Sequence, residues 1–205
     1  MPERIDELNT VQLDFLTEIS SIGSGNAVTA LSQLLNRKVT MAIHAAKFVP
    51  FKEASDFAGG AEQIVLGVVV NLSGDLDGIM MFLIGIDAAK KLLGLIIGEE
   101  NISDGSFSEF ERSTATEIGN ILNSSYLSSL SSLTSKKINQ SVPYCSVDMA
   151  NAILSVPAIE FGKVSDSALF IDSAFEIEGV NIKGYFILVP DMQSFNGIFA
   201  SFGVM

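Results

Sequence analysis

The chain has 205 residues, of which 48% are apolar, so it is long enough and apolar enough to bury a sizeable core. Its 12 basic and 24 acidic residues give a net charge of −12, which argues against nucleic-acid binding and against attachment to an anionic membrane surface. Cys145 and His44 are the single cysteine and histidine, so no disulfide framework or Cys/His metal site can be assembled. The acidic N-terminus lacks the features of a secretory signal, and charges interrupt the most apolar region before it reaches the roughly 20 residues of a membrane span. We therefore expect a cytoplasmic protein without membrane insertion.

The first predicted element is a helix followed by a stretch with two glycines. Apolar residues recur at spacings of three and four from Val11 to Ile22, which is a helical period. Gly23 and Gly25 follow, and they suggest a phosphate-binding loop. Such a loop needs a strand before the glycines and a further glycine where Val28 stands, and this sequence has neither. We therefore expect the glycines to lie beyond the helix and to bind no phosphate.

Strands and a second helix are predicted next. The apolar segments 64–71 and 78–84 are bounded by turn residues and predict a hairpin. A helix is expected over 87–97, with Gly98 as its C-terminal cap.

The N-terminal helix has a second copy 99 residues further along the chain. Residues 16–39 align with 115–138, the tripeptide Thr-Glu-Ile recurs, and Glu117 corresponds to Glu18. The serines of 124–135 are small, and we expect them to let this long helix lie close to its duplicate. The second copy is followed by the same kinds of element as the first, namely strands over 168–177 and 180–189 and a short helix from 191 to about 203.

This duplication predicts a single domain, residues 1–205, built from two pseudo-symmetric halves. The halves span about 10–98 and 109–203, and the acidic segment 99–108 joins them. The expected fold class is α+β, with the strands of both halves in one antiparallel sheet that the long helices cover. The order of the strands does not follow from the sequence.

Glu117 and Asn120 are the strongest candidates for chemistry. They are three residues apart and therefore share one helix face with Ser113, whereas Ile118 and Leu122 lie on another face. A carboxylate can clamp a cation on a partner, and a carboxamide can hold a water and a phosphoryl oxygen. The spacing alone is equally compatible with an ordinary solvated helix face.

These residues resemble a known signature. The pattern Ser113, Glu117, Asn120 and Pro143, together with the wording EIGN at 117–120, is similar to that of the CheC/CheX/FliY chemotaxis phosphatases. Two copies in a chain of 205 residues resemble the CheC type, since CheX has one site in a shorter chain and FliY carries an additional domain.

The resemblance implies hydrolysis of the phospho-aspartate on the response regulator CheY. Glu117 would pair with a lysine of the regulator, and Asn120 would orient the hydrolytic water. The regulator would supply the divalent metal, so the resemblance implies no metal or other cofactor in this chain.

The first copy departs from the signature. Asp14 and Glu18 are retained, but Ser21 replaces the asparagine and His44 the proline. A serine hydroxyl is too short to reach the same water, so this site is expected to be degenerate, either catalytically impaired or used for docking.

The resemblance also implies a second partner, the receptor deamidase CheD. The matching segment is 146–154, which we expect to be a helix, with Asp148 as the contact residue. The alternative is that Val147, Met149 and Ile153 merely form a packed helix face. If Asp148 contacts CheD, the alternative function is that of a non-catalytic chemotaxis or flagellar adaptor that binds and regulates CheD.

Overall fold

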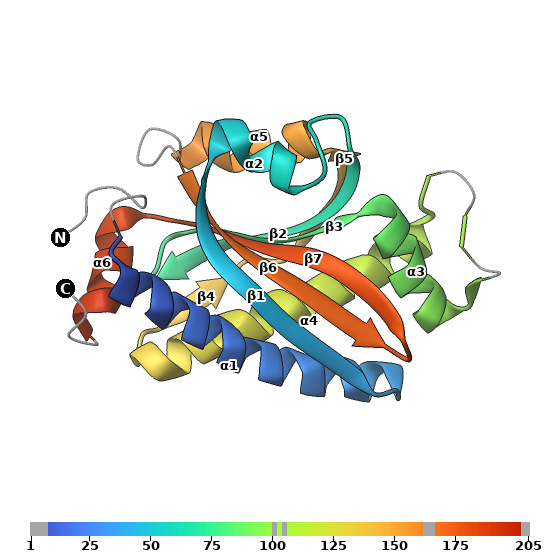
Figure 1. Cartoon of the computed structure of the whole chain (residues 1–205), viewed down its shortest axis with the longest axis horizontal. Coiled ribbons are helices and arrows are strands. Elements are labelled where there is room, and N and C mark those ends of the chain that lie inside the picture. The colour runs from blue at the N-terminus through green and yellow to red at the C-terminus, as the bar shows by residue number, and fades with distance from the viewer. Residues whose placement is uncertain (1–7, 100–101, 104–105, 162–166, 202–205) are drawn as a thin grey trace.

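The computed structural model describes residues 8–99, 102–103, 106–161 and 167–201 (Figure 1). Their helices and strands follow in this order: α1 (Thr10–Leu35), β1 (Val39–Pro50), α2 (Phe51–Phe57), β2 (Ile64–Gly74), β3 (Gly78–Gly85), α3 (Ile86–Ile97), α4 (Glu109–Thr134), β4 (Ile138–Gln140), β5 (Tyr144–Met149), α5 (Ala150–Phe161), β6 (Ser167–Ile177), β7 (Val180–Pro190) and α6 (Met192–Ser201). The two predicted hairpins are present, and Gly98 caps α3 with a φ of 89°. The predicted end of the last helix near 203 and part of the segment 99–108 lie outside the described residues.

Seven strands of the described chain form one curled, antiparallel sheet, which confirms the predicted α+β class. The strand order is β1-β6-β7-β3-β2-β4, and β5 also pairs with β2. The strand after each long helix therefore pairs with the hairpin of the other half: β1 joins β6, and β4 and β5 join β2. The hairpins meet in the middle through β3 and β7. This exchange means that neither half can complete its part of the sheet alone.

The long helices α1 and α4 run side by side across one face of the sheet (Figure 1). The prediction that the glycines lie beyond the first helix is wrong, because α1 continues through Gly23 and Gly25 to Leu35. Gly23 is buried, and a Cβ atom there would lie 3.2 Å from the Cα of Tyr126 on α4. Close helix packing thus explains a glycine that would otherwise weaken the helix by about 0.5–1 kcal/mol.

Apolar side chains form one core on each face of the sheet. The larger core lies between the sheet and α1, α3, α4 and α6, and it includes Leu16, Phe82 and Leu130. The smaller core lies under α2 and α5 and includes Met81 and Ile153. None of the helices in the described ranges combines the length and the apolar character needed to cross a membrane.

The segment 146–154 is not a single helix. Its first part belongs to β5, where Asp148 pairs with Val65 of β2, and the helix α5 begins only at Ala150. The prediction of a helix at Asp148 is therefore wrong. The reason is tertiary: pairing with a strand 83 residues earlier in the chain keeps this segment extended.

The start of α4 is fixed by a buried carboxylate, Glu111. Its two carboxylate oxygens accept hydrogen bonds of 2.6–2.8 Å from the backbone N–H and hydroxyl groups of Ser103 and Ser108. Ser108 is the N-cap residue and accepts in return from the N–H of Glu111, which completes a capping box. Burial opposes ionisation of Glu111, but the hydrogen bonds from both serines outweigh it and lower its pKa from 4.5 to about 2.

We expect Glu111→Gln to destabilise the protein at neutral pH by about 1.5–3 kcal/mol, because an amide cannot accept four hydrogen bonds at two oxygens. The depressed pKa makes the contribution of Glu111 fully present above about pH 4.5 and lost as the pH falls toward 2. Urea unfolding of both proteins between pH 7 and pH 3 measures this. A difference in stability that stays constant across that range would contradict the assignment.

Candidate functional site

The candidate residues lie on one side of α4. Ser113 and Glu117 are exposed, Asn120 is half-buried, and Ile118 and Leu122 on another face are buried in the core. The polar stripe therefore faces away from the sheet. A partner protein can reach both the carboxylate and the carboxamide.

The orientation of this stripe is set by a close contact between α4 and β2. A Cβ atom on Gly119 would lie 2.4 Å from the Cβ of Val68, so the helix approaches the strand as closely as it does because position 119 has no side chain. The buried Asn123 donates from Nδ2 to the Val68 carbonyl at 3.2 Å. Asn120 is thus adjacent in sequence to a position at which its helix lies close against β2.

Asn120 is held by two neighbours. Its Oδ1 accepts a hydrogen bond of 2.9 Å from Nε2 of Gln140 and a longer one of 3.4 Å from the hydroxyl of Ser124. Gln140 is the last residue of β4, and its Nε2 also donates to the Ser124 hydroxyl oxygen at 2.7 Å. Gln140 could not be identified from the sequence, because it follows Asn120 by 20 residues and belongs to no local pattern.

Pro143 of the signature lies between β4 and β5. Proline has no N–H to donate to a strand ladder, and the register with β2 breaks between Gln140 and Tyr144, although the Ser141 N–H still donates to the Asn71 carbonyl at 2.9 Å. A side-chain bridge spans the gap, since the Asn71 N–H donates to Oγ of Ser141 at 3.0 Å. In the first half β1 continues through position 44 with a shift in register. Pro143 therefore lies at the break between β4, the short strand that carries Gln140, and β5.

The corresponding residues of the first half lie on α1. Asp14, Glu18 and Ser21 are all exposed, so this stripe is also accessible. The Ser21 hydroxyl donates to the carbonyl of Thr17 at 3.1 Å, which ties it to its own helix. This stripe has a carboxylate but no carboxamide.

Each stripe begins with an exposed apolar side chain that the sequence analysis missed. Phe110 is 66% exposed and lies one turn before Ser113. Val11, which Phe110 follows by 99 positions, is 61% exposed and lies one turn before Asp14. The repeat of an exposed apolar residue at the same position is a signal that the alignment of the two halves could have revealed.

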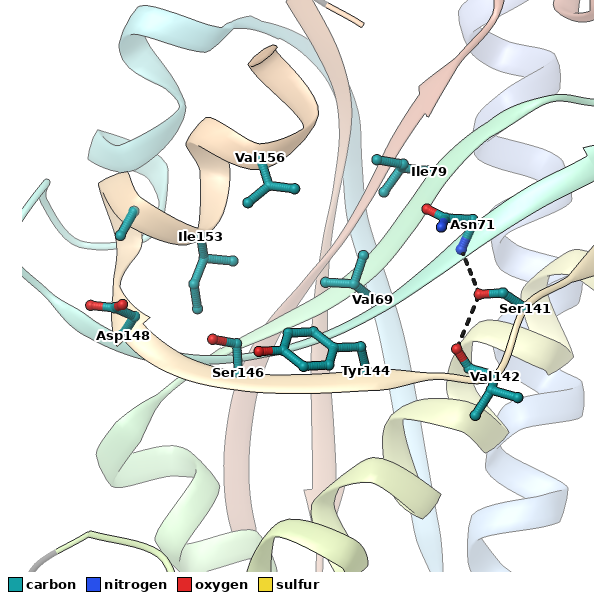
Figure 2. Close-up of a pocket in the computed structure, with 11 residues that line it drawn as sticks. Val69, Asn71, Ile79, Ser141, Val142, Tyr144, Ser146, Asp148, Ile153 and Val156 are labelled. Atoms are coloured by element: carbon teal, nitrogen blue, oxygen red, sulfur yellow. Dashed lines mark hydrogen bonds between the residues drawn. The ribbon is translucent and has the colours of Figure 1, made fainter. Parts of the chain in front are cut away.

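Asp148 lies at the rim of a groove between β5 and α5. None of the residues that line this groove belongs to α4. Among the described strands, β5 pairs with β2 alone, so its other edge is open. The groove has a volume of about 390 Å³, and Figure 2 shows Tyr144, Ser146 and Asp148 along the strand opposite Ile153 and Val156 of α5. Asp148 is exposed and accepts from the N–H of Met149 at 2.7 Å.

No metal site is assembled within the described residues: they contain no group of three or more His, Cys, Asp or Glu side chains placed to hold an ion. The carboxylates of the two stripes, Glu18 and Glu117, stand on separate helices.

Known proteins resemble this chain over nearly its whole length. The model of the CheC-like family matches residues 11–42 and 110–146, which include both helical stripes. The chain is 34% identical over 196 residues to the CheY-P phosphatase CheC of Bacillus subtilis, covering 94% of each protein. It is 22% identical over 184 residues to the putative CheY-P phosphatase CheC1 of Halobacterium salinarum, covering 90% of this chain and 92% of that protein.

The fold resembles that of a solved FliY structure. The crystal structure of FliY from Thermotoga maritima superposes with a TM-score of 0.75 and 21% sequence identity. The superposition covers 95% of this chain and 99% of the FliY chain.

Proposed function

The chain belongs to the CheC-like family, and we propose that it is a phosphatase that hydrolyses the phospho-aspartate of a CheY-like receiver. The observation that carries this proposal is the accessible stripe of α4, where an exposed Glu117 lies one turn from a carboxamide held in place. The near full-length similarity to a protein named CheY-P phosphatase supports it. Phosphorylated receivers act in the cytoplasm, where we expect this chain to work.

In the proposed mechanism the α4 stripe enters the active site of the receiver. Glu117 pairs with a lysine of the receiver and fixes the docking geometry, while Asn120 positions the attacking water. Phosphoryl transfer requires mainly positioning and charge stabilisation, so one oriented amide can contribute substantially. The divalent metal belongs to the receiver in this proposal, and this chain contributes no cofactor.

The stripe of α1 is the degenerate counterpart. Glu18 can still pair with a receiver lysine, but Ser21 has no amide to offer a water and its hydroxyl is bonded to its own helix. We propose that this site is catalytically impaired and keeps at most a docking role.

The direct test follows the decay of phosphorylated CheY with and without the purified chain. We expect the chain to accelerate release of inorganic phosphate at catalytic amounts. A decay rate that does not respond to the chain would favour the non-catalytic adaptor.

Phe110 supplies the apolar contact of this docking. The chain is strongly acidic, and an acidic receiver would be repelled at long range, so binding depends on local contacts. We expect Phe110→Ala to raise the KM for phosphorylated CheY about tenfold and to leave kcat within about twofold, since an exposed aromatic anchor can contribute about 1–2 kcal/mol. Phe57, 39% exposed on α2, offers a matched Phe→Ala control that should change neither constant. A fall in kcat alone for Phe110→Ala would contradict a docking role.

A second candidate function is the binding of CheD at the open groove of Figure 2. The observation that favours it is the exposure of apolar side chains beside Asp148: Tyr144 is 67% and Met149 44% exposed. Although Asp148 lies on a strand and not on a helix, its carboxylate remains accessible to a basic group of a partner.

We expect Asp148→Lys to weaken binding of CheD at least tenfold, because it replaces an attractive charge with a repulsive one at the rim of the groove. Titration calorimetry measures the effect, with Asp56→Lys on the exposed side of α2 as the charge-matched control. The decay of phosphorylated CheY should be the same in both variants. Equal CheD affinity of Asp148→Lys and the unsubstituted chain would remove Asp148 from the interface.

A further inference from the structure

The side chain of Gln140 makes hydrogen bonds that are not part of the strand pairing of β4. It is half-buried, and its Nε2 lies within hydrogen-bond distance of both Asn120 Oδ1 and Ser124 Oγ. Its own Oε1 is buried, and no described group donates to it. The hydrogen bonds of Nε2 thus link β4 to the carboxamide of the α4 stripe.

The two halves of the chain provide an internal comparison. At a spacing of 99 positions, Asn120, Ser124 and Gln140 correspond to Ser21, Gly25 and Met41. All three members of the hydrogen-bonded group are therefore replaced together in the first half by residues that cannot form it. The carboxylate of the stripe, by contrast, is present in both halves. Ser124 and Gln140 are thus present only in the half that has the carboxamide, whereas the carboxylate is present in both halves.

The contacts also select one orientation of the carboxamide. The last torsion of an asparagine side chain is broad, so an unsupported amide on a helix surface would sample both orientations. Gln140 and Ser124 both donate to Oδ1, which commits the carbonyl to these two neighbours and leaves the Nδ2 amide group as the part of the side chain that is available to a partner. The NH2 group of a carboxamide donates hydrogen bonds and does not accept them.

We propose that Gln140, assisted by Ser124, is a positioning residue that holds the carbonyl of Asn120 so that its Nδ2 amide group faces the attacking water. This inference rests on the proposed function. During hydrolysis the water oxygen bonds to phosphorus, and the bond to the receiver's aspartate oxygen breaks with its electron pair staying on that carboxylate. Both protons of the water end on the released phosphate. The Nδ2 amide group of Asn120 donates to the oxygen of the attacking water and does not act as the base.

Substitution of Gln140 tests the proposal by kinetics of phosphorylated CheY decay. Gln140→Met copies the residue of the first half and removes the donor. We expect kcat to fall about tenfold with KM within about twofold, since the docking surface is unchanged and only the alignment of the amide is lost. Asn139→Met, on the same strand, controls for any effect of methionine on β4 and should keep both constants. Thermal unfolding of all variants verifies that they fold.

Gln140→Glu tests the orientation. A carboxylate at this position accepts a hydrogen bond from the Nδ2 amide group of Asn120 and so reverses the orientation of the carboxamide. We therefore expect kcat to fall below that of Gln140→Met. If Gln140→Glu retains the kcat of the unsubstituted chain, the proposed orientation is overturned.

A double variant separates positioning from a structural role. If Gln140 acts through Asn120, adding Gln140→Met to Asn120→Ala should not lower the residual kcat any further. A second, independent loss in the double variant would overturn the proposal. Two outcomes distinguish the proposed function from this inference: full activity of Asn120→Ala removes the proposed site, whereas loss of activity in Asn120→Ala without loss in Gln140→Met removes only the role of Gln140.

Discussion

Asn120→Ala is expected to lower the kcat for hydrolysis of phosphorylated CheY about 100-fold. The substitution removes the amide that the α4 stripe presents to the reacting group, and removal of one oriented donor from a hydrolytic site typically costs a factor of 10² to 10³. The protein should unfold at nearly the same temperature, because Asn120 is half-buried and the apolar face of α4 is untouched. Release of phosphate from radiolabelled CheY under saturating conditions measures the effect.

The control for this prediction is Asn181→Ala. Asn181 is exposed in the hairpin of β6 and β7, so the same chemical change there should leave kcat and KM as they are. The affinity for CheY should also persist in Asn120→Ala, since Glu117 and Phe110 remain in place. Undiminished kcat in Asn120→Ala would exclude this residue from the reaction.

Gly119→Ala is expected to lower both the stability of the protein and its activity. The new Cβ would lie 2.4–2.7 Å from three carbon atoms of Val68, a side chain buried in the core. Relief of this overlap requires α4 to move away from β2, and overpacking of a core typically costs about 1–3 kcal/mol. This cost exceeds the roughly 1 kcal/mol that alanine gains over glycine in a helix. At the upper end of the overpacking range, we therefore expect a net loss of about 2 kcal/mol in the free energy of unfolding. We also expect reduced phosphatase activity, because Asn120 moves with its helix.

Gly25→Ala provides the matched substitution on α1. A Cβ at Gly25 would meet no described atom within 4 Å, so only the helix propensity changes. This variant should gain about 0.5–1 kcal/mol in stability and keep its activity. Chemical unfolding of both variants gives the comparison directly. Destabilisation of equal size at the two glycines would contradict the packing explanation for Gly119.

The elements with a local pattern were predicted well. The hairpin of β2 and β3 and the helix α3 follow from short apolar runs and their flanking glycines, and such signals need no knowledge of distant residues. Where a local signal met a tertiary contact, the prediction failed. Gly23 suggests the end of a helix, but it marks the place where α1 packs against Tyr126. Asp148 precedes a helical segment, but pairing with Val65 holds it in a strand.

The candidate site also has one part that follows from a local pattern and one part that depends on a tertiary contact. Glu117 and Asn120 could be identified from the sequence, because a spacing of three places two side chains on one helix face wherever the helix lies. The support of Asn120 by Gln140 could not, since it joins a helix to a strand that reaches it only through pairing with β2.

The sequence by itself determined that residues 16–39 are similar to 115–138, which side chains form the two polar stripes, and that one stripe lacks its carboxamide. These properties depend on residue identity and helical periodicity, which act over a few positions. The tertiary structure decided that the halves exchange strands, that β5 is left with an open edge, and that the carbonyl of Asn120 faces Gln140. These properties depend on pairing and packing between segments far apart in the chain, where many arrangements bury similar apolar area and only the assembled sheet selects one.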